Sequence, residues 1–177
     1  YIKQCTFEKT NNFDFSIQNP TAIKLWDVSR VSIFGNTFVN NVSNDSCKHF
    51  GNGIVLINAK ATICAFSYGL HNTNKIPNTF TNLKIPINVL GSDYTNIVDN
   101  VFENNYIAIA NGRYSSGIIR NNSINVPPRG YGIYATPGNN FKIEQNEITG
   151  QKSGVGIVAE STTLQELYKN SISDMEI

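Results

Sequence analysis

The sequence predicts an all-β protein, a right-handed parallel β-helix of about seven coils that forms a single domain over residues 1–177. Three observations predict this fold. A motif returns every 22 to 24 residues, short apolar strands precede it at a nearly constant distance, and the chain contains twenty-six Asn and thirteen Gly. Because Asn and Gly favour turns and disfavour helices, the composition agrees with a solenoid of short strands and tight bends.

The recurring motif has the form apolar-x-x-Asn-x-apolar and marks one bend of each coil. It occurs at Ile33–Phe38, Ile97–Phe102, Ile119–Ile124, Ile143–Ile148 and Leu167–Ile172. Ile2–Phe7 is the same motif with Cys5 in the Asn place, where we expect a small buried side chain. The residues expected at the bend are Asn36, Asn78, Asn100, Asn122, Asn146 and Asn170. Stacking of coils would let each side-chain amide bond to the next along the rod.

A pair of apolar residues two positions apart precedes each motif, which is the period of a strand with alternate side chains inward. These strands begin from Ile23, Ile54, Ile87, Ile107, Ile133 and Ile157. The distance to the first apolar residue of the Asn motif is ten residues in four coils, but nine at Ile54 and twelve at Ile107. We expect these six isoleucines to form one interior column. A second column is expected to contain Ile33, Ile63, Ile97, Ile119, Ile143 and Leu167. Right-handedness follows from the crossover preference of parallel strands.

Two insertions interrupt the repeat around the third coil, at residues 39–53 and 64–77. Since a β-helix keeps its core by exporting extra residues, both are expected to project as loops, where function often resides. A further ambiguity concerns residues 162–170, whose propensities favour a helix while the repeat register favours a last coil. We favour the coil.

Charge and hydropathy exclude several classes of partner. Fourteen Lys and Arg balance thirteen Asp and Glu, so nothing points to nucleic acid or to an anionic membrane surface. No apolar run is long enough to span a bilayer, and we expect no membrane insertion. Three Cys are too few for a disulfide framework and barely constrain the compartment.

With its Asn motifs and the preceding strands GIYA (132–135) and GIVA (156–159), the sequence resembles the right-handed parallel β-helix repeat family of the pectate-lyase-like superfold. The resemblance covers nearly the whole chain. It implies an extracellular or cell-surface protein with polysaccharide as a partner. It names no reaction, because that fold carries lyases, hydrolases and non-catalytic adhesins alike.

Enzymatic residues are not evident. A glycoside hydrolase needs paired carboxylates, and no two of the acids in the regular coils are aligned and adjacent. These acids are Asp93, Asp99, Glu103, Glu144 and Glu147. A lyase would need a Ca²⁺ cluster, which is missing, beside a base such as Arg120. Arg120 and Glu144 share an outward column on neighbouring coils, where we expect a solvated cross-strand ion pair.

The insertions bring four metal-ligating residue types together in sequence: Cys47, His49, Cys64 and His71. A zinc site and a Cys47–Cys64 disulfide are both open alternatives, although the spacing matches no known zinc motif. We favour unpaired thiols, and we expect no metal and no cofactor.

Aromatic and basic residues outside the interior columns are candidates for carbohydrate contact: Tyr114, Tyr131, Tyr134, Arg113 and Arg129. Only a row of aromatic rings along one face, with polar groups between them, would indicate a glycan track. We expect a non-catalytic scaffold or adhesion module that contacts carbohydrate. The alternative is a lyase or glycoside hydrolase whose catalytic residues lie partly beyond this chain.

Both ends of the chain fall within the repeat, at Ile2–Phe7 and Leu167–Ile172. A solenoid that stops in mid-repeat presents unpaired strand edges and an open apolar cross-section. We therefore expect the chain to be a fragment of a longer protein, with further coils or another chain covering its ends.

Overall fold

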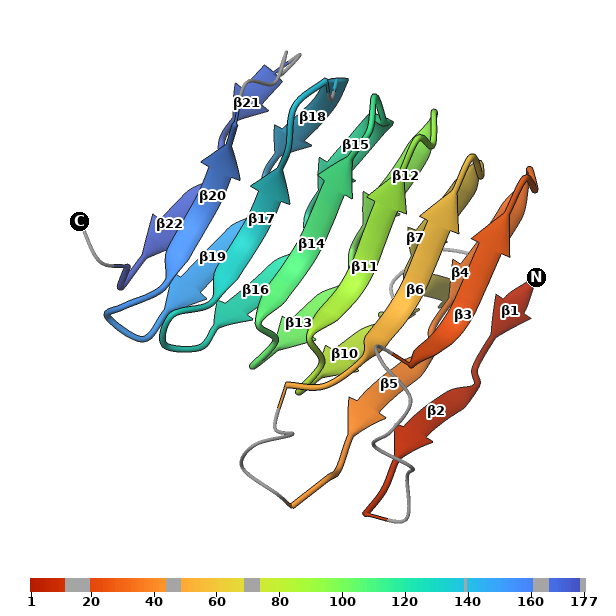
Figure 1. Ribbon diagram of the computed structural model, residues 1–177, viewed down its shortest axis with the longest axis horizontal. Coiled ribbons are helices and arrows are strands. Elements are labelled where there is room, and N and C mark those ends of the chain that lie inside the picture. The colour runs from red at the N-terminus through yellow and green to blue at the C-terminus, as the bar shows by residue number, and fades with distance from the viewer. Residues whose placement is uncertain (12–19, 44–48, 69–73, 139, 161–165, 176–177) are drawn as a thin grey trace.

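The structure, a computed structural model, describes residues 1–11, 20–43, 49–68, 74–138, 140–160 and 166–175. It is the expected right-handed parallel β-helix, with strands stacked along one rod (Figure 1). Three parallel sheets run the length of the rod, and the described residues form no helix. None of these residues belongs to a helix long and apolar enough to cross a membrane.

We name the three sheets A, B and C. Sheet A contains β1 (Ile2–Lys3), β4 (Val31–Phe34), β7 (Ala61–Cys64), β12 (Thr95–Val98), β15 (Ser116–Arg120), β18 (Asn140–Glu144) and β21 (Glu166–Tyr168). Sheet B contains β2 (Thr6–Lys9), β5 (Thr37–Asn40), β10 (Thr79–Thr81), β13 (Val101–Glu103), β16 (Ser123–Val126), β19 (Glu147–Gly150) and β22 (Ser171–Ser173). Sheet C contains β3 (Thr21–Trp26), β6 (Asn52–Ile57), β11 (Ile85–Leu90), β14 (Ile107–Gly112), β17 (Tyr131–Ala135) and β20 (Val155–Ala159).

Each coil supplies strands to sheets C, A and B in that order, and the first described coil supplies only sheets A and B. Seven coils result. The interior column predicted in sheet A is confirmed, because the strand register pairs its members in sequence from Ile33 to Leu167. Five of its members are fully buried: Ile33, Ile63, Ile97, Ile119 and Ile143.

The column predicted in sheet C is wrong at one position. Ile109, and not Ile107, pairs with Ile87 and Ile133. Ile107 pairs with Tyr131 on the outer face. Ala108 and Ile109 are both buried, at 2% and 0% exposure, so the strand bends there and the alternation of a flat strand is broken. Counted from Ile109, the distance to the Asn motif is the usual ten residues.

Sheet B contributes a stack of phenylalanines to the core. Phe7, Phe38, Phe80 and Phe102 lie nearly parallel, with successive ring centroids 4.8, 4.7 and 4.9 Å apart. The spacing equals the rise of one coil, because each ring occupies the same register position in its own strand. Ile124, Ile148 and Ile172 continue the same column.

The predicted Asn ladder runs along the bend between sheets A and B. Asn122 shows its pattern: Oδ1 accepts the backbone N–H and the side-chain amide of Asn100, both at 3.0 Å. Its own amide donates to the carbonyl of Ile97 at 2.9 Å and to Asn146 Oδ1 at 3.0 Å. The side chains of the ladder are joined from Asn36 to Asn170 in this way.

The ladder also reaches the first coil. The backbone N–H of Cys5 donates to Asn36 Oδ1 at 2.9 Å, so Cys5 does occupy the Asn place. The expectation that it is buried is wrong, because no described coil covers it and its side chain is exposed. Its thiol donates to the carbonyl of Lys3 at 3.4 Å.

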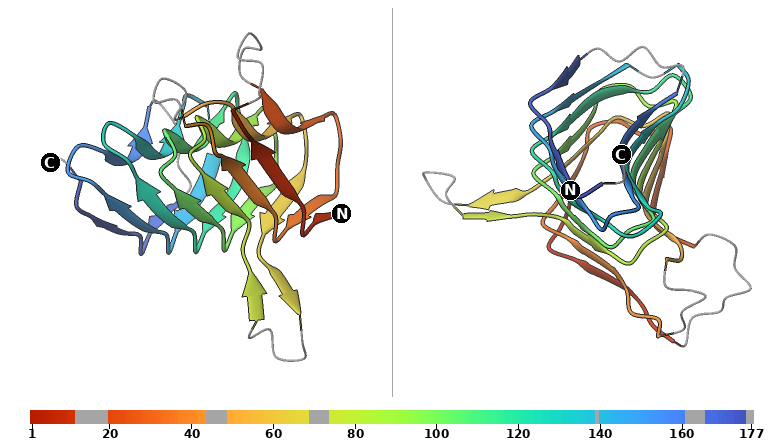
Figure 2. Two further views of the ribbon diagram at one scale, coloured as in Figure 1. Left: turned by 90° about the horizontal axis from the view of Figure 1, so that it is seen from below. Right: turned by 90° about the vertical axis from the view of Figure 1, so that its left-hand side faces the viewer.

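The insertions leave the rod at two different corners. The first insertion connects β5 of sheet B to β6 of sheet C. The second, after Cys64, forms an antiparallel hairpin of β8 (Phe66–Tyr68) and β9 (Asn74–Ile76). The hairpin projects far from the rod (Figure 2). A third long connection, from β2 to β3, was not predicted. At the other end, Glu166–Tyr168 pairs with β18 as expected of a last coil, and residues 161–165 lie outside the described residues.

Lys9 ties the beginnings of the second and third coils together. Its Nζ donates to the carbonyls of Phe50 and Pro20, at 3.1 and 3.4 Å. A Cβ at Gly51 would overlap the Lys9 ammonium, so only glycine leaves room for it. The amine lies beside a cavity of about 380 Å³ whose lining includes Phe7 and Phe38. Burial lowers the pKa of Lys9 from 10.5 to about 8.

The lowered pKa of Lys9 predicts a pH-dependent stability. Between pH 8 and 10.5 the unfolded chain holds a proton that the folded chain has lost, so the free energy of unfolding rises with pH in this window. Because the amine is partly solvated, the rise is expected to be about 1 kcal/mol. Urea denaturation at pH 7 and pH 10 checks it, with Lys9→Met as the control that lacks this contribution. An equal pH response of both proteins would contradict it.

Candidate functional site

The outer faces of the three sheets differ in chemistry. Sheet B presents mostly hydroxyl, amide and carboxylate groups to solvent, with Val39 and Val101 as apolar exceptions. Its two outward columns include Thr6, Thr37, Thr79, Ser123, Glu147, Ser171, Thr81, Glu103, Asn125 and Thr149. A polar face of this kind is the ordinary surface of a half-buried sheet.

Sheet C presents a largely apolar outer face, with Lys24, Asn52 and Asn88 among its polar residues, and it includes two of the predicted tyrosines. Its outward residues include Val55, Ile57, Ile85, Leu90, Ile107, Ala110, Tyr131, Tyr134, Val155 and Val158. The rings of Tyr131 and Tyr134 meet edge to face with centroids 5.5 Å apart. Tyr106 adds a third ring, 6.0 Å from that of Tyr131. Tyr106 lies in a turn before its strand, where no periodic pattern marks it.

The five residues expected to contact carbohydrate do not form one row. Arg113 and Tyr114 follow sheet C at its corner with sheet A, and Arg129 precedes it at the corner with sheet B. Tyr114 is 82% exposed and lies close to Gly138. The strand neighbours of Tyr131 and Tyr134 are aliphatic, and the polar residues of this face, such as Asn88 and Lys24, lie in earlier coils, so polar groups do not alternate with the rings as in a glycan track.

Sheet A carries a groove along the rod, which we call the sheet A groove. Two hollows of about 300 and 500 Å³ adjoin in it, and Tyr94 lines both. The first is also lined by Arg30, Ser32, Lys60 and Thr62. The second is also lined by Asp93, Asn96, Ser116, Asn140 and Lys142. The groove therefore has polar groups on both sides of an aromatic ring.

Tyr94 is the most prominent side chain of this groove. It is 72% exposed, and its φ of 55° places a bulky residue in the left-handed region. Left-handed residues recur at the bends of the coils, among them Arg113 and Asn121, so this conformation is a feature of the fold. The Lys60 ammonium lies 4.9 Å from the centre of its ring. The sequence signal that could have found Tyr94 is an aromatic residue at a turn position that Ser116 and Asn140 fill in later coils.

The cations on the outer face of sheet A fall into two groups. Those in the later coils have carboxylate partners, Arg120 with Glu144 and Lys142 with Glu166, and Lys75 of the hairpin is likewise paired with Asp99. The predicted ion pair of Arg120 and Glu144 is thus confirmed, at 3.6 Å. Arg30 and Lys60 make no ion pair with any carboxylate in the described part of the chain.

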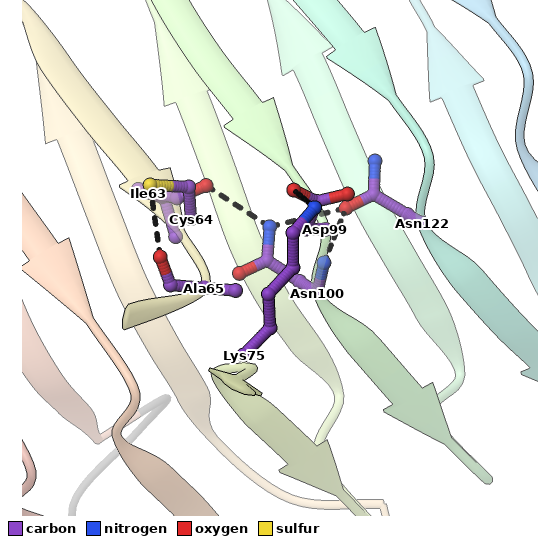
Figure 3. Close-up of polar contacts among 7 residues, drawn as sticks. All are labelled: Ile63, Cys64, Ala65, Lys75, Asp99, Asn100 and Asn122. Carbon is purple, nitrogen blue, oxygen red and sulfur yellow. Dashed lines mark hydrogen bonds and ion pairs between the residues drawn. The ribbon is translucent and has the colours of Figure 1, made fainter. Parts of the chain in front are cut away.

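Asp99 anchors the base of the projecting hairpin. Its carboxylate meets the Lys75 ammonium at 2.8 Å, beside the Asn ladder at Asn100 (Figure 3). Cys64 lies nearby and donates its thiol to the carbonyl of Ala65 at 3.5 Å. Burial and then the negative charge of Asp99 raise the pKa of the Cys64 thiol, while Lys75 opposes them. The thiol is protonated at neutral pH and is a weak nucleophile.

The weak metal candidates are not brought together among the described residues. His49 lies before β6 at the corner of sheets B and C, whereas Cys64 ends β7 at the corner of sheets A and B. Cys47 and His71 lie outside the described residues. The described residues include no group of three His, Cys, Asp or Glu side chains that could hold a metal ion. Cys64 is a free thiol.

The carboxylates of the regular coils are largely engaged elsewhere. Asp93 accepts a hydrogen bond from the Ser116 hydroxyl at 3.0 Å. Asp99 and Glu144 are ion-paired, and Glu103 and Glu147 lie on the outer face of sheet B. Glu103 and Glu147 share the outer face of sheet B but lie in different columns, two coils apart.

Comparison with known proteins gives a family but no close relative. No curated protein and no solved structure matches the chain. Residues 51–177 match the family described as periplasmic copper-binding protein (NosD). That description places family members outside the cytoplasm, in keeping with the compartment expected from the sequence. Since the match covers more than half of the chain and follows the coils from β6 to β22, this protein belongs to the NosD family.

Proposed function

We propose that this chain is a non-catalytic binding scaffold that acts outside the cytoplasm and contacts carbohydrate along the sheet A groove. The observation that carries the proposal is Tyr94, an exposed ring at the junction of two hollows lined by hydroxyl, amide and amine groups. The family description supports a periplasmic location. The interior ladders support a rigid scaffold, because they fix the positions of outward side chains.

The chemistry of the groove suits a sugar chain. A pyranose ring has one apolar C–H face that packs on an aromatic side chain, and hydroxyl groups at its rim that need hydrogen-bond partners. Tyr94 supplies the aromatic ring, and Asn96, Ser116 and Asn140 supply hydrogen-bonding groups for the sugar hydroxyls. Successive coils repeat every ~4.8 Å, which is close to the rise of one sugar unit in an extended glycan.

The carbohydrate contact is thus proposed at Tyr94 on sheet A and not at Tyr131 and Tyr134 on sheet C. Their face of sheet C is wide and apolar, and Tyr134 already donates its hydroxyl to Glu160 at 2.7 Å. Exposed apolar faces of this kind are typical of surfaces that other molecules cover. The groove around Tyr94 meets the requirement for polar groups between rings better than sheet C does.

Copper is the ligand that the family description names, and the described residues do not fit it. Copper prefers thiolate, thioether and imidazole ligands. The described sulfur and imidazole groups, Cys5, Cys64, His49 and Met175, come from separate parts of the rod. His49 Nε2 is buried without a hydrogen-bond partner, but no second soft ligand is described beside it. We therefore do not propose a copper site in the described part of the chain.

Glycan-array binding tests the proposed function. Wild-type protein is expected to bind at least one glycan, and Tyr94→Ala is expected to weaken that binding about tenfold or more by removing the stacking ring. Tyr94→Phe keeps the ring and should retain most of the binding. Tyr134→Ala, on sheet C, is the matched control and should bind as wild type does. An assay for unsaturated or hydrolysed product, run in parallel, should give no signal; turnover would favour the enzyme alternative.

We also propose that a second copy of the chain covers the exposed end of the rod. In the last coil Leu167 and Ile172 belong to interior columns but are 57% and 47% exposed. In a solution of the pure protein, contact with a second copy of the chain would bury these two side chains. Sedimentation at rising concentration is expected to show association, which Leu167→Glu should abolish by placing a charge in the contact. A wild-type chain that stays monomeric would contradict the proposal.

A further inference from the structure

The N-terminal half of the sheet A groove is cationic. The hollow of about 300 Å³ is lined by Tyr1, Arg30, Val31, Ser32, Lys60, Ala61, Thr62 and Tyr94, a set with two cations and no carboxylate. The other hollow contains both signs, Asp93 and Lys142. The charge of the groove therefore changes along the rod: the end toward the first coils is positive, and the other end contains charges of both signs.

Arg30 and Lys60 are held in register for a single ligand. Val31 pairs with Ala61, so the residues before them stack on neighbouring coils. Lys60 and Tyr94 are neighbours in the same way, because Thr62 pairs with Asn96. Arg30, Lys60 and Tyr94 thus stand one after another along the axis at the ~4.8 Å spacing of parallel strands.

The backbone and the aromatic ring keep these cations at the groove. Arg30 lies at a bend with a φ of 61°, a conformation that many bends of the rod share, and it lines the hollow together with Lys60. The Lys60 ammonium contacts the Tyr94 ring at 4.9 Å, which retains it near the site without neutralising its charge. Cations without a carboxylate partner, beside an exposed ring, are suited to an anionic ligand that also has an apolar face.

We propose that the sheet A groove selects acidic saccharides, with a uronate carboxylate bound by Arg30 and Lys60 and an adjoining sugar ring packed on Tyr94. This inference rests on the proposed carbohydrate contact and adds the ligand class and the residues that choose it. Arg30 offers the planar fork that matches a carboxylate, and Lys60 offers a point charge. The half of the groove that contains Asp93 takes the neutral part of the chain.

The test uses a matched pair of ligands, the unsulfated chondroitin tetrasaccharide and its methyl ester, which differ in the charge of the uronate. Titration calorimetry is expected to show at least tenfold tighter binding of the acid by wild-type protein at low salt. The acid should lose affinity as NaCl rises and the ester should not, because salt screens only the charged contact. Arg30→Gln/Lys60→Gln should abolish the preference, so that the variant binds the acid no more tightly than it binds the ester.

Two controls separate the outcomes. Lys24→Gln removes another lysine that lies over an exposed ring, 5.5 Å from that of Trp26 on sheet C, and should leave the preference intact. Thermal unfolding of each variant, which should match that of wild type, excludes loss of fold. Equal binding of acid and ester would overturn the acidic preference and leave the proposed function standing. Failure of both ligands, and of every glycan on the array, would overturn both.

Discussion

Replacing Asn122 by alanine is expected to lower the free energy of unfolding by about 2–4 kcal/mol, because several buried groups lose their partners at once. The backbone N–H and the side-chain amide of Asn100 lose their acceptor, and the carbonyl of Ile97 loses its donor. Asn122 is 1% exposed, so water cannot replace these bonds. Urea denaturation measures the loss.

Two further variants sharpen this prediction. Asn125→Ala, three residues away on the exposed face of β16, should change the free energy of unfolding by no more than about 0.5 kcal/mol. Asn122→Asp keeps the acceptor for Asn100 but removes the amide that donates to Ile97 and Asn146, and should be destabilising as well. A stable Asn122→Ala protein would mean that the ladder contributes little to the fold.

The parts of the fold that the sequence predicted are those in which one residue type repeats for one physical reason. The Asn ladder is such a case, because an amide is required both to donate and to accept along the axis. The isoleucines of sheet A are another, since a flat strand alternates and each inward position is buried. Periodicity alone identifies both.

Other features were missed because the repeat pattern alone does not determine them. The strands of sheet C share a bend before the inward isoleucine, as at Pro86–Ile87 and Ala108–Ile109, so Ile107 lies outside the core, and the twelve-residue spacing was the sequence signal for it. Cys5 has the right register but lacks a covering coil. The hairpin of β8 and β9 is antiparallel, so it follows none of the repeat rules that identified its neighbours.

The candidate site was the least predictable part. Whether outward side chains meet depends on which corner or face each occupies, and this requires the register of every coil. Tyr131 and Tyr134 meet on the outer face of sheet C, but Arg129 and Tyr114 lie at opposite corners of their sheet. Tyr94 stands out only when its exposure and the two adjoining hollows are considered together.

Replacing Ile109 by alanine is expected to cost about 2–5 kcal/mol, as a large-to-small change does in a packed core. Ile109 is fully buried between Ile87 and Ile133, and no neighbour can move into the space without breaking the stack. The loss should appear in urea denaturation as a lower midpoint with an unchanged slope.

Ile107→Ala is the matched control for this prediction, since it removes the same atoms from the same strand two residues away. Ile107 is half-buried on the outer face of sheet C, where the side chains of its neighbours can adjust, and its loss should cost about 1 kcal/mol or less. The difference between the two variants therefore measures the strand register directly. A larger loss at Ile107 than at Ile109 would instead favour the column in which Ile107, and not Ile109, lies inward between Ile87 and Ile133.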